Sequence, residues 1–190
     1  MMRAITLRNP YAWAVIHGGK PVENRTRNII GPYRGPAAIH AGLNHDWNIP
    51  EHDDALHAAL NRAIDTMDKP CGCPDCLDTL PGMAYGAVIG VAEIIGVHHH
   101  EDLDILAQNR HIVDARPSRT EPCSPWAQRG MWHIELANPI PLPEPIPCKG
   151  NQNLWTLLGD VEKAINTQLR SLDYYREQVI LPLILRAIPC

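Results

Sequence analysis

The sequence predicts an α+β fold in which short strands predominate over helices. Proline accounts for 18 residues and phenylalanine for none, which favours a loop-rich protein over a helical bundle. Apolar residues make up 45% of the 190-residue chain and charged residues 20%, so a packed core is expected and wholesale disorder is not. Residues 84–97 are rich in Val and Ile with interspersed Gly, typical of a strand that bends around a barrel.

The chain begins with a predicted strand and a short helix. Residues 4–7 form the strand, and Asn9 then suits a helix N-cap. Pro10 occupies the first helical position, where its missing N–H has no intrahelical partner to lose. The helix over residues 11–17 is expected to stop at Gly18-Gly19.

An insertion is predicted to follow the second strand, which covers residues 36–41. Pro50 opens a helix with acidic residues in its first turn, which suits the helix dipole. Apolar residues recur along one face of this helix, namely Leu56, Leu60, Ala63, Ile64 and Met67. We interpret residues 42–82 as a helical, cysteine-containing insertion between strands.

The C-terminal half contributes further strands and a last helix. Residues 131–137 are predicted to be a strand, whereas the proline-rich stretch 139–147 is confined to an edge or a loop. Asp160 caps a helix with an apolar stripe, and Pro182 ends or kinks it. The expected domains are therefore residues 1–158 and a helical extension over 159–190.

The chain carries no secretory signal pattern and no run of 18 apolar residues, so we expect a cytoplasmic protein with no membrane partner. In that reducing compartment its cysteines are thiols or metal ligands. Cys71, Cys73 and Cys76 lie close enough to bind one structural zinc ion, and the alternative is that they are reduced thiols. The candidates for the fourth ligand are His52, His57, Cys123 and Cys148.

Basic charge is concentrated at the N-terminus, although the whole chain has a net charge of −4. Residues 1–40 contain six basic side chains and one carboxylate, a net charge of +5, whereas residues 41–82 sum to −6. A local basic face can bind phosphate on an acidic protein because salt screens charges beyond roughly 8–10 Å. The alternative is an ordinary solvated surface.

One motif lies within this basic stretch, Gly18-Gly-Lys-Pro-Val-Glu-Asn-Arg25. It follows directly on the first helix, so a cation, a carboxylate and a guanidinium (Lys20, Glu23, Arg25) are crowded at the start of a strand. Such a group suits a polar ligand that carries phosphate or a base edge. The alternative is an exposed ion-pair cluster that contributes little.

The motif resembles the GxKxxExR signature of the ASCH domain family, a PUA-like group. Other segments resemble bacterial and phage members of that family in the same order along residues 2–158. They are Tyr33-Arg-Gly-Pro-Ala-Ala-Ile-His-Ala41, Gly90-Val-Ala-Glu93, Ser124-Pro-Trp-Ala with Gly130-Met-Trp-His, and Pro147-Cys-Lys-Gly with Leu154-Trp155.

The resemblance implies a small PUA-like β-barrel flanked by helices, with a cleft beside the signature helix and a link to RNA. Family members are reported to bind RNA, to cleave it, or, in a short bacterial branch, to remove the acetyl group from acetylcytidine. That branch uses a Lys, a Thr three positions later and a Glu on a later strand, which correspond here to Lys20, Glu23 and Glu93. Since a carboxylate replaces the Thr and Thr26 lies beyond Arg25, that deacetylation mechanism is not expected here.

Three functions remain open from the sequence. In the first, the cleft binds a nucleotide of single-stranded or modified RNA through Tyr11, Lys20, Glu23, Arg25, Arg34, His40, Ser124 and Trp126. In the second, the protein is a hydrolase, either a ribonuclease or an amidohydrolase that acts on a modified nucleoside. Lys20 would be the polarising cation and Glu23 or Glu93 the base that activates water. In the third, it is an interaction module whose acidic insertion and apolar C-terminal tail recruit proteins, and the cleft has no function. Independently of these functions, the C-terminal extension can mediate a homodimer.

Several aromatic residues and histidines permit two interpretations. Trp13 and Trp155 are expected in the core, whereas Tyr11 and Trp126 can stack on bases. His40 is interpreted either as a structural residue of its strand or as a ligand donor or general acid–base. His98-His-His100 resembles a metal-binding tract, but we expect these histidines to be exposed.

Overall fold

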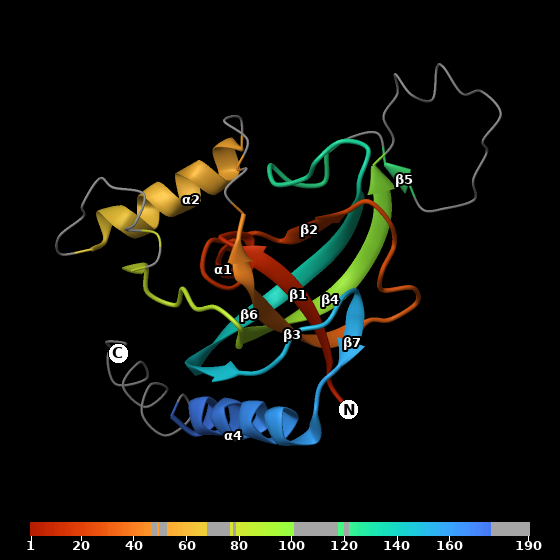
Figure 1. Ribbon diagram of the computed structural model, residues 1–190. Coiled ribbons are helices and arrows are strands. Elements are labelled where there is room, and N and C mark those ends of the chain that lie inside the picture. The colour runs from red at the N-terminus through yellow and green to blue at the C-terminus, as the bar shows by residue number, and fades with distance from the viewer. Residues whose placement is uncertain are drawn as a thin grey trace, which may run out of the picture.

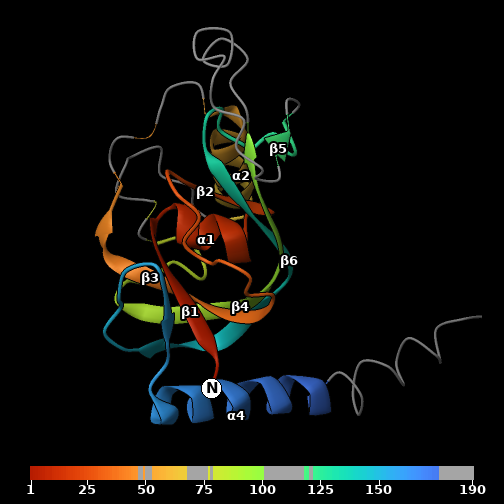
Figure 2. The ribbon, with the colours of Figure 1, turned by 90° about the vertical axis from the view of Figure 1, so that its right-hand side faces the viewer.

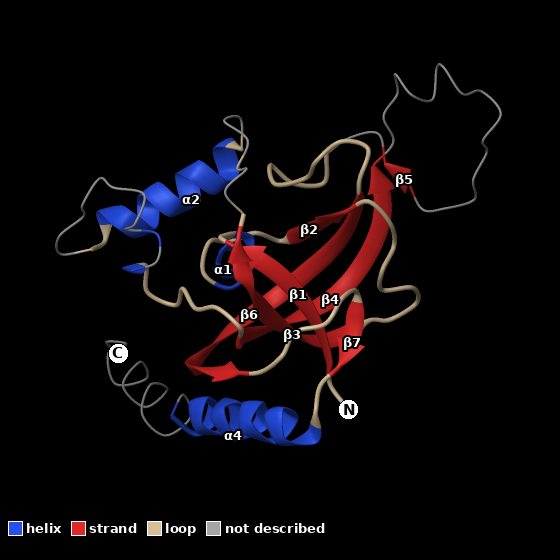
Figure 3. Ribbon diagram, viewed as in Figure 1, coloured by secondary structure: helices blue, strands red, loops and turns tan. Residues whose placement is uncertain are grey.

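The structure is a computed structural model, which describes residues 1–46, 49, 53–67, 77, 79–100, 118–119 and 122–175. Its strands are β1 (Arg3–Asn9), β2 (Val22–Arg25), β3 (Gly35–His45), β4 (Ala87–His100), β5 (Ser118–Arg119), β6 (Trp132–Pro147) and β7 (Leu154–Thr156). Its helices are α1 (Tyr11–Ile16), α2 (Asp54–Asp65) and α4 (Gly159–Tyr175). Strands and helices together confirm the predicted α+β class (Figure 3).

One mixed, seven-stranded sheet forms the centre of the protein, in the order β2-β6-β4-β3-β1-β7, with β5 paired to β4 (Figure 1). β1 and β3 are parallel, and α1 and β2 lie between them in the chain. The other long pairings, β3 with β4 and β4 with β6, are antiparallel. This curved sheet is the framework on which the helices and the loops of the cleft are placed.

The sheet remains open, although the family resemblance implies a closed barrel. β2 is one end of the strand order and β7 is the other, and no ladder in the described chain joins them. β2 is only four residues long and pairs with β6 alone. β7 covers only Arg3, Ala4 and Ile5 of β1, so the outer edge of β1 beyond Ile5 has no strand neighbour among the described residues.

The two faces of the sheet are covered by different helices. α1 packs on one face, where its Val15 and Ile16 join a core with alternate residues of the strands, such as Ile39 and Ile94. α4 covers the other face, where Val161 and Ile165 are buried (Figure 2). None of the described helices is long and apolar enough to cross a membrane.

Gly90 of β4 allows α1 to lie close to the sheet. A Cβ at this position would lie 2.5 Å from Ile16 Cδ1 and 2.8 Å from the carbonyl oxygen of Ile140, closer than a methyl group fits. The glycine that the sequence shows within this strand is therefore a site of close approach.

Two element boundaries differ from those expected. α2 begins at Asp54 instead of Pro50, because the Asp53 side chain accepts a hydrogen bond from the Leu56 N–H and caps the helix there. The proline-rich residues 139–147 continue the strand of 132–137 as one element, β6. They form a sheet edge, as prolines require, because β2 pairs only with residues 132–135 of that strand.

The predicted insertion packs on α1. Trp13 of α1 is 3% exposed and lies in a cluster with Leu56 and Leu60 of α2 and with Leu80. Its indole Nε1 donates to the Pro81 carbonyl oxygen at 3.0 Å. α1 therefore lies between the sheet and the described part of the insertion, and the expectation that Trp13 is a core residue is confirmed.

Candidate functional site

A cleft lies where the sheet is open, between β2 and the outer edge of β1. Its volume is about 720 Å³, within the range of small-molecule sites. The side chains that line it come from β1, α1, β2 and the loops around them, and they are Thr6, Leu7, Arg8, Tyr11, Lys20, Glu23, Asn24, Arg25, Thr26, Arg27, Ile29, Asp46, Gln128, Asn151, Gln152 and Asn153.

Two arginine side chains span the open part of the sheet. Arg25 Nη2 donates to the Thr6 carbonyl oxygen at 2.9 Å, so a side chain of β2 contacts the uncovered edge of β1. Arg27 Nη2 donates to Asn153 Oδ1 at 3.1 Å. These contacts hold the two sides of the cleft together without a backbone ladder.

The signature motif folds back on α1. Gly19 has φ +75°, a conformation that favours glycine, and the Lys20 N–H donates to the Ala14 carbonyl oxygen at 3.0 Å. The turn ends α1 and starts β2. It places Lys20 at the floor of the cleft, where its side chain is only 2% exposed.

Glu23 lies between two cations. Its Oε2 is 3.1 Å from Lys20 Nζ, and its Oε1 is 3.0 Å from Arg25 Nε. Lys20 Nζ also donates to the Val22 carbonyl oxygen and lies 5.7 Å from the centre of the Tyr11 ring. The predicted cation, carboxylate and guanidinium therefore form one compact, largely buried network, not an exposed ion-pair cluster.

Tyr11 connects this network to the insertion. Its hydroxyl donates to Asp53 Oδ2 at 2.9 Å, while Asp53 Oδ1 caps α2. Burial, followed by the hydrogen bond to Asp53, raises the pKa of Tyr11 well above its usual value. The phenol therefore stays protonated and serves as a donor at physiological pH.

The solvent-exposed part of the cleft is basic and rich in amide side chains. Arg8 has a side chain that is 65% exposed and forms a 3.9 Å ion pair with Asp46, and Arg27 is also exposed. With Lys20 and Arg25 they place four cations in the lining, against the carboxylates of Glu23 and Asp46. Five amide side chains complete it: Asn24, Gln128, Asn151, Gln152 and Asn153.

Glu93 lies apart from this cleft. Its neighbours on β4, Ala92 and Ile94, face the core beneath α1, so Glu93 points to the other face of the sheet, where it is exposed. Its Oε2 accepts from Asn138 Nδ2 at 3.0 Å. Glu93 was predicted to line the same surface as Lys20, but it does not, because the alternation of side chains along β4 directs its carboxylate to the opposite face of the sheet.

Arg34 and His40 are also outside the lining. Arg34 is exposed and donates to the carbonyl oxygens of Gly31 and Tyr33 in its own loop. His40 is 2% exposed, and its Nε2 lies 3.0 Å from the Cys148 carbonyl oxygen. Burial lowers the pKa of this imidazole, so it is neutral at physiological pH, and its contacts favour the structural interpretation.

Ser124 and Trp126 support one wall of the cleft without lining it. Ser124 Oγ accepts from the Trp126 N–H at 3.2 Å. Asn24 of β2 donates through Nδ2 to the Trp126 carbonyl oxygen and accepts at Oδ1 from the Gln128 N–H. This loop, residues 122–131, is thereby attached to β2, and Gln128 is the member that reaches the cleft.

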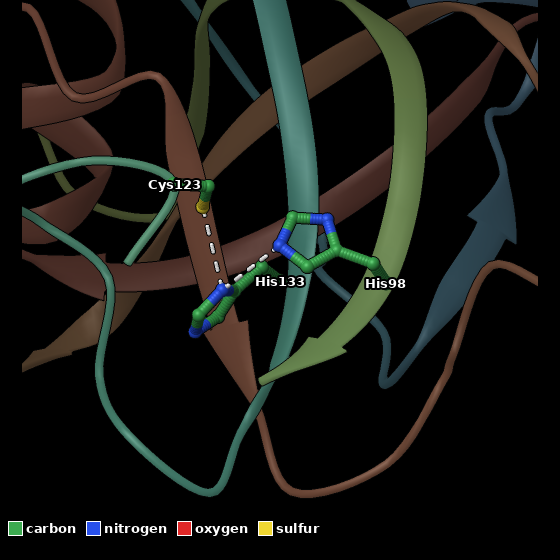
Figure 4. Close-up of side chains that lie close together, drawn as sticks. All are labelled: His98, Cys123 and His133. Atoms are coloured by element: carbon green, nitrogen blue, oxygen red, sulfur yellow. Dashed lines mark hydrogen bonds between the residues drawn. The ribbon is translucent and has the colours of Figure 1, made fainter. Parts of the chain in front are cut away.

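The predicted metal ligands Cys71, Cys73 and Cys76 lie outside the described residues, as does His52. A different group of side chains can hold a metal: the ligand atoms of His98, Cys123 and His133 all lie within 4.8 Å of one another (Figure 4).

The expectation that residues 98–100 are exposed is wrong for His98 and His100, each 3% exposed. The register of β4 with β6 places His98 opposite His133 and turns both rings inward.

The sequence interpretation missed several cleft residues. Arg8 and Arg27 belong to the basic stretch that it identified, and the charge asymmetry was the signal that marked them. The amide run Asn151–Asn153 carries no comparable signal, because amides are common in any loop. It reaches the cleft through the turn that precedes β7, where Asn153 has φ +60°.

Comparisons with known proteins add a resemblance in fold. No model of a known family matches the sequence, and no curated protein matches it. Among solved structures, the chain is similar to an ASCH protein from Zymomonas mobilis (14% identity, TM-score 0.46, covering 87% of this chain and 94% of that one). It is similar also to a point mutant of that protein (16% identity, TM-score 0.44, covering 87% and 96%). At this level of similarity the function has to be argued from the residues of the cleft.

Proposed function

We propose that the cleft binds a nucleotide of single-stranded or modified RNA. The observation that carries this proposal is the convergence of four basic and five amide side chains in one cavity of about 720 Å³. Cations suit phosphate oxygens, and amides pair with the donor and acceptor edges of bases. A nucleotide offers both kinds of group to one cavity.

The exposed cations serve as the phosphate contacts. Arg8 and Arg27 are exposed at the cleft, whereas Lys20 is buried beneath Glu23 and Arg25. The amides around them meet the base edges, and Tyr11 is the aromatic ring of the lining. Lys20 and Glu23 then fix the floor on which the nucleotide rests.

The hydrolase alternative has less support. It requires a carboxylate that is available as a base near Lys20, and Glu93 does not line the cleft. Both oxygens of Glu23 are already engaged by Lys20 and Arg25. A carboxylate held in this way stabilises the fold and orients its neighbours, which favours binding over cleavage.

Two arginines provide a matched test of the proposal. Arg27→Ala is expected to weaken binding of a short single-stranded RNA by about 1–3 kcal/mol, the loss of one charge-assisted contact. Arg34→Ala removes the same charge seven positions later, from an exposed side chain outside the cleft, and is expected to leave affinity nearly unchanged. Fluorescence anisotropy with labelled RNA measures both.

Equal weakening by the two substitutions would mean that attraction is diffuse and that the cleft is not the site. A wild-type protein that binds neither RNA nor nucleoside at low salt would contradict the proposal. The interaction-module interpretation would then be preferred.

The salt dependence of binding gives an independent prediction. A cleft of this size reaches about two or three phosphates, so log affinity is expected to fall with log salt by roughly 0.7 per contact. Arg27→Ala is expected to reduce that slope by about one contact, whereas Lys163→Ala on α4 leaves it unchanged. A steep slope in the wild type would indicate an extended surface instead of a cleft.

Lys20→Ala is expected to cost about 1–3 kcal/mol in affinity, because the floor of the cleft loses the charge-assisted contact between Lys20 and Glu23.

A further inference from the structure

Three side chains near the cleft, two of them buried and Cys123 partly buried, form a group that the proposed RNA contacts do not use. His98 lies on β4, His133 on β6, and Cys123 in the loop of residues 122–131 (Figure 4). His98 is 3% exposed and His133 is fully buried. Imidazole and thiolate are the ligands that zinc prefers.

The spacing of the ligand atoms fits tetrahedral coordination. His133 Nδ1 lies 3.3 Å from His98 Nε2 and 3.4 Å from Cys123 Sγ. Zn–N bonds of about 2.0–2.1 Å and Zn–S bonds of about 2.3 Å place neighbouring ligand atoms of a tetrahedral site roughly 3.3–3.6 Å apart. Both distances that involve His133 are therefore close to those of an assembled site.

The other nitrogen of each ring lies beside an acceptor oxygen. His98 Nδ1 lies 2.6 Å from Glu135 Oε1, within reach of the carboxylate. His133 Nε2 donates to the Gln128 carbonyl oxygen at 2.7 Å. Metal-bound histidines are oriented in this way, by a carboxylate or a backbone carbonyl on the nitrogen remote from the metal.

The contact with Gln128 determines where the lone pair of His133 points. Because His133 Nε2 donates its proton, the neutral ring has its lone pair on Nδ1, the atom that faces His98 Nε2 and Cys123 Sγ. A lone pair in this position can bind a metal ion that His98 and Cys123 also reach.

We propose that His98, His133 and Cys123 bind a single zinc ion, with Glu135 and the Gln128 carbonyl orienting the two histidines. On binding, the Cys123 thiol loses its proton to solvent and coordinates as the thiolate. Three protein ligands leave one tetrahedral position open, for water or for His100, whose ring centre lies 5.7 Å from that of His133.

The ion would fix the loop that forms one wall of the RNA cleft. Cys123 and Gln128 belong to that loop, and Gln128 both lines the cleft and accepts from His133. His133 is paired in register with Asn24, another lining residue. This role rests on the proposed RNA-binding function, but the metal site itself does not depend on it.

Metal binding can be tested on the full chain, with Cys71, Cys73 and Cys76 changed to Ser so that these thiols do not compete. Titration with Co²⁺ is expected to give one equivalent of bound metal with a thiolate-to-cobalt charge-transfer band. Cys123→Ser in this background is expected to abolish the band. Cys148→Ser, which removes the other free cysteine of the described residues, is expected to retain it.

Zinc affinity provides the second measurement, by competition with a chromophoric chelator. Glu135→Gln keeps the side-chain size and is expected to lower zinc affinity by about 10–100-fold, as found when a group that orients a ligand is changed. This variant keeps all three ligands, so it decides the case if Cys123→Ser fails to fold.

The proposal is overturned if the Cys-to-Ser background binds no Co²⁺, or if Cys123→Ser leaves the band unchanged. It is also overturned if Glu135→Gln binds zinc as tightly as its parent. RNA binding by zinc-loaded protein is a separate readout: its absence would contradict the proposed function and leave the metal site intact.

Discussion

Replacing Glu23 with Gln is expected to lower the free energy of unfolding by about 3–5 kcal/mol, the usual cost of removing one partner from a buried ion pair. Lys20 has a side chain that is 2% exposed and depends on Glu23 Oε2 as its counter-charge. Gln keeps the volume but leaves this ammonium group buried without an anion. Urea unfolding followed by circular dichroism measures the change.

Two variants test the cause of that loss. Glu93→Gln makes the same chemical change at an exposed residue outside the cleft and is expected to alter stability by less than about 0.5 kcal/mol. Adding Lys20→Met to Glu23→Gln removes the stranded charge and is expected to restore part of the stability. Equal effects of Glu23→Gln and Glu93→Gln would show that the Lys20–Glu23–Arg25 network does not stabilise the fold.

Trp13→Ala is expected to cost about 3–5 kcal/mol, as for other buried tryptophans. Trp13 is 3% exposed, and α2 and Leu80 pack against it on one side of α1. Its removal leaves a cavity between α1 and the insertion. Unfolding followed by far-ultraviolet circular dichroism is the appropriate measurement, because the substitution removes a fluorophore.

The size and the polarity of Trp13 can be separated. Trp13→Phe keeps most of the apolar surface and loses the 3.0 Å bond from Nε1 to the Pro81 carbonyl oxygen, so we expect a smaller loss than for Ala. Trp126→Ala, at a partly buried residue beside the same cluster, is also expected to cost less. If Trp13→Ala costs no more than Trp126→Ala, the insertion does not depend on α1 for its packing.

Local signals predicted the part of the cleft that is formed by local structure. The glycine pair after the first helix required a turn, and that turn places Lys20, Glu23 and Arg25 together within one short segment. Nothing distant was needed to infer that network. The basic charge of residues 1–40 likewise marked Arg8 and Arg27 as part of a cationic surface, although it did not show that both line the cleft.

Features that depend on strand register were not predictable from the sequence. Glu93 was assigned to the cleft, but one step along a strand reverses the face of a side chain, and its neighbours Ala92 and Ile94 occupy the core face. The pairing of β4 with β6 also brings His98 to His133 across 35 positions in the chain. The histidine tract was visible in the sequence, whereas its partners and its burial depended on that pairing.

The open sheet also leaves a strand edge that other proteins usually protect. Beyond Ile5 the outer edge of β1 has no strand neighbour among the described residues, and an exposed edge can pair with a strand of another molecule. Arg25 occupies this edge by bonding to the Thr6 carbonyl oxygen, and its charge opposes the approach of a second strand. Arg25 therefore both lines the cleft and hinders edge-to-edge aggregation. A residue that replaces it has to preserve the solubility of the protein as well as the affinity of the cleft.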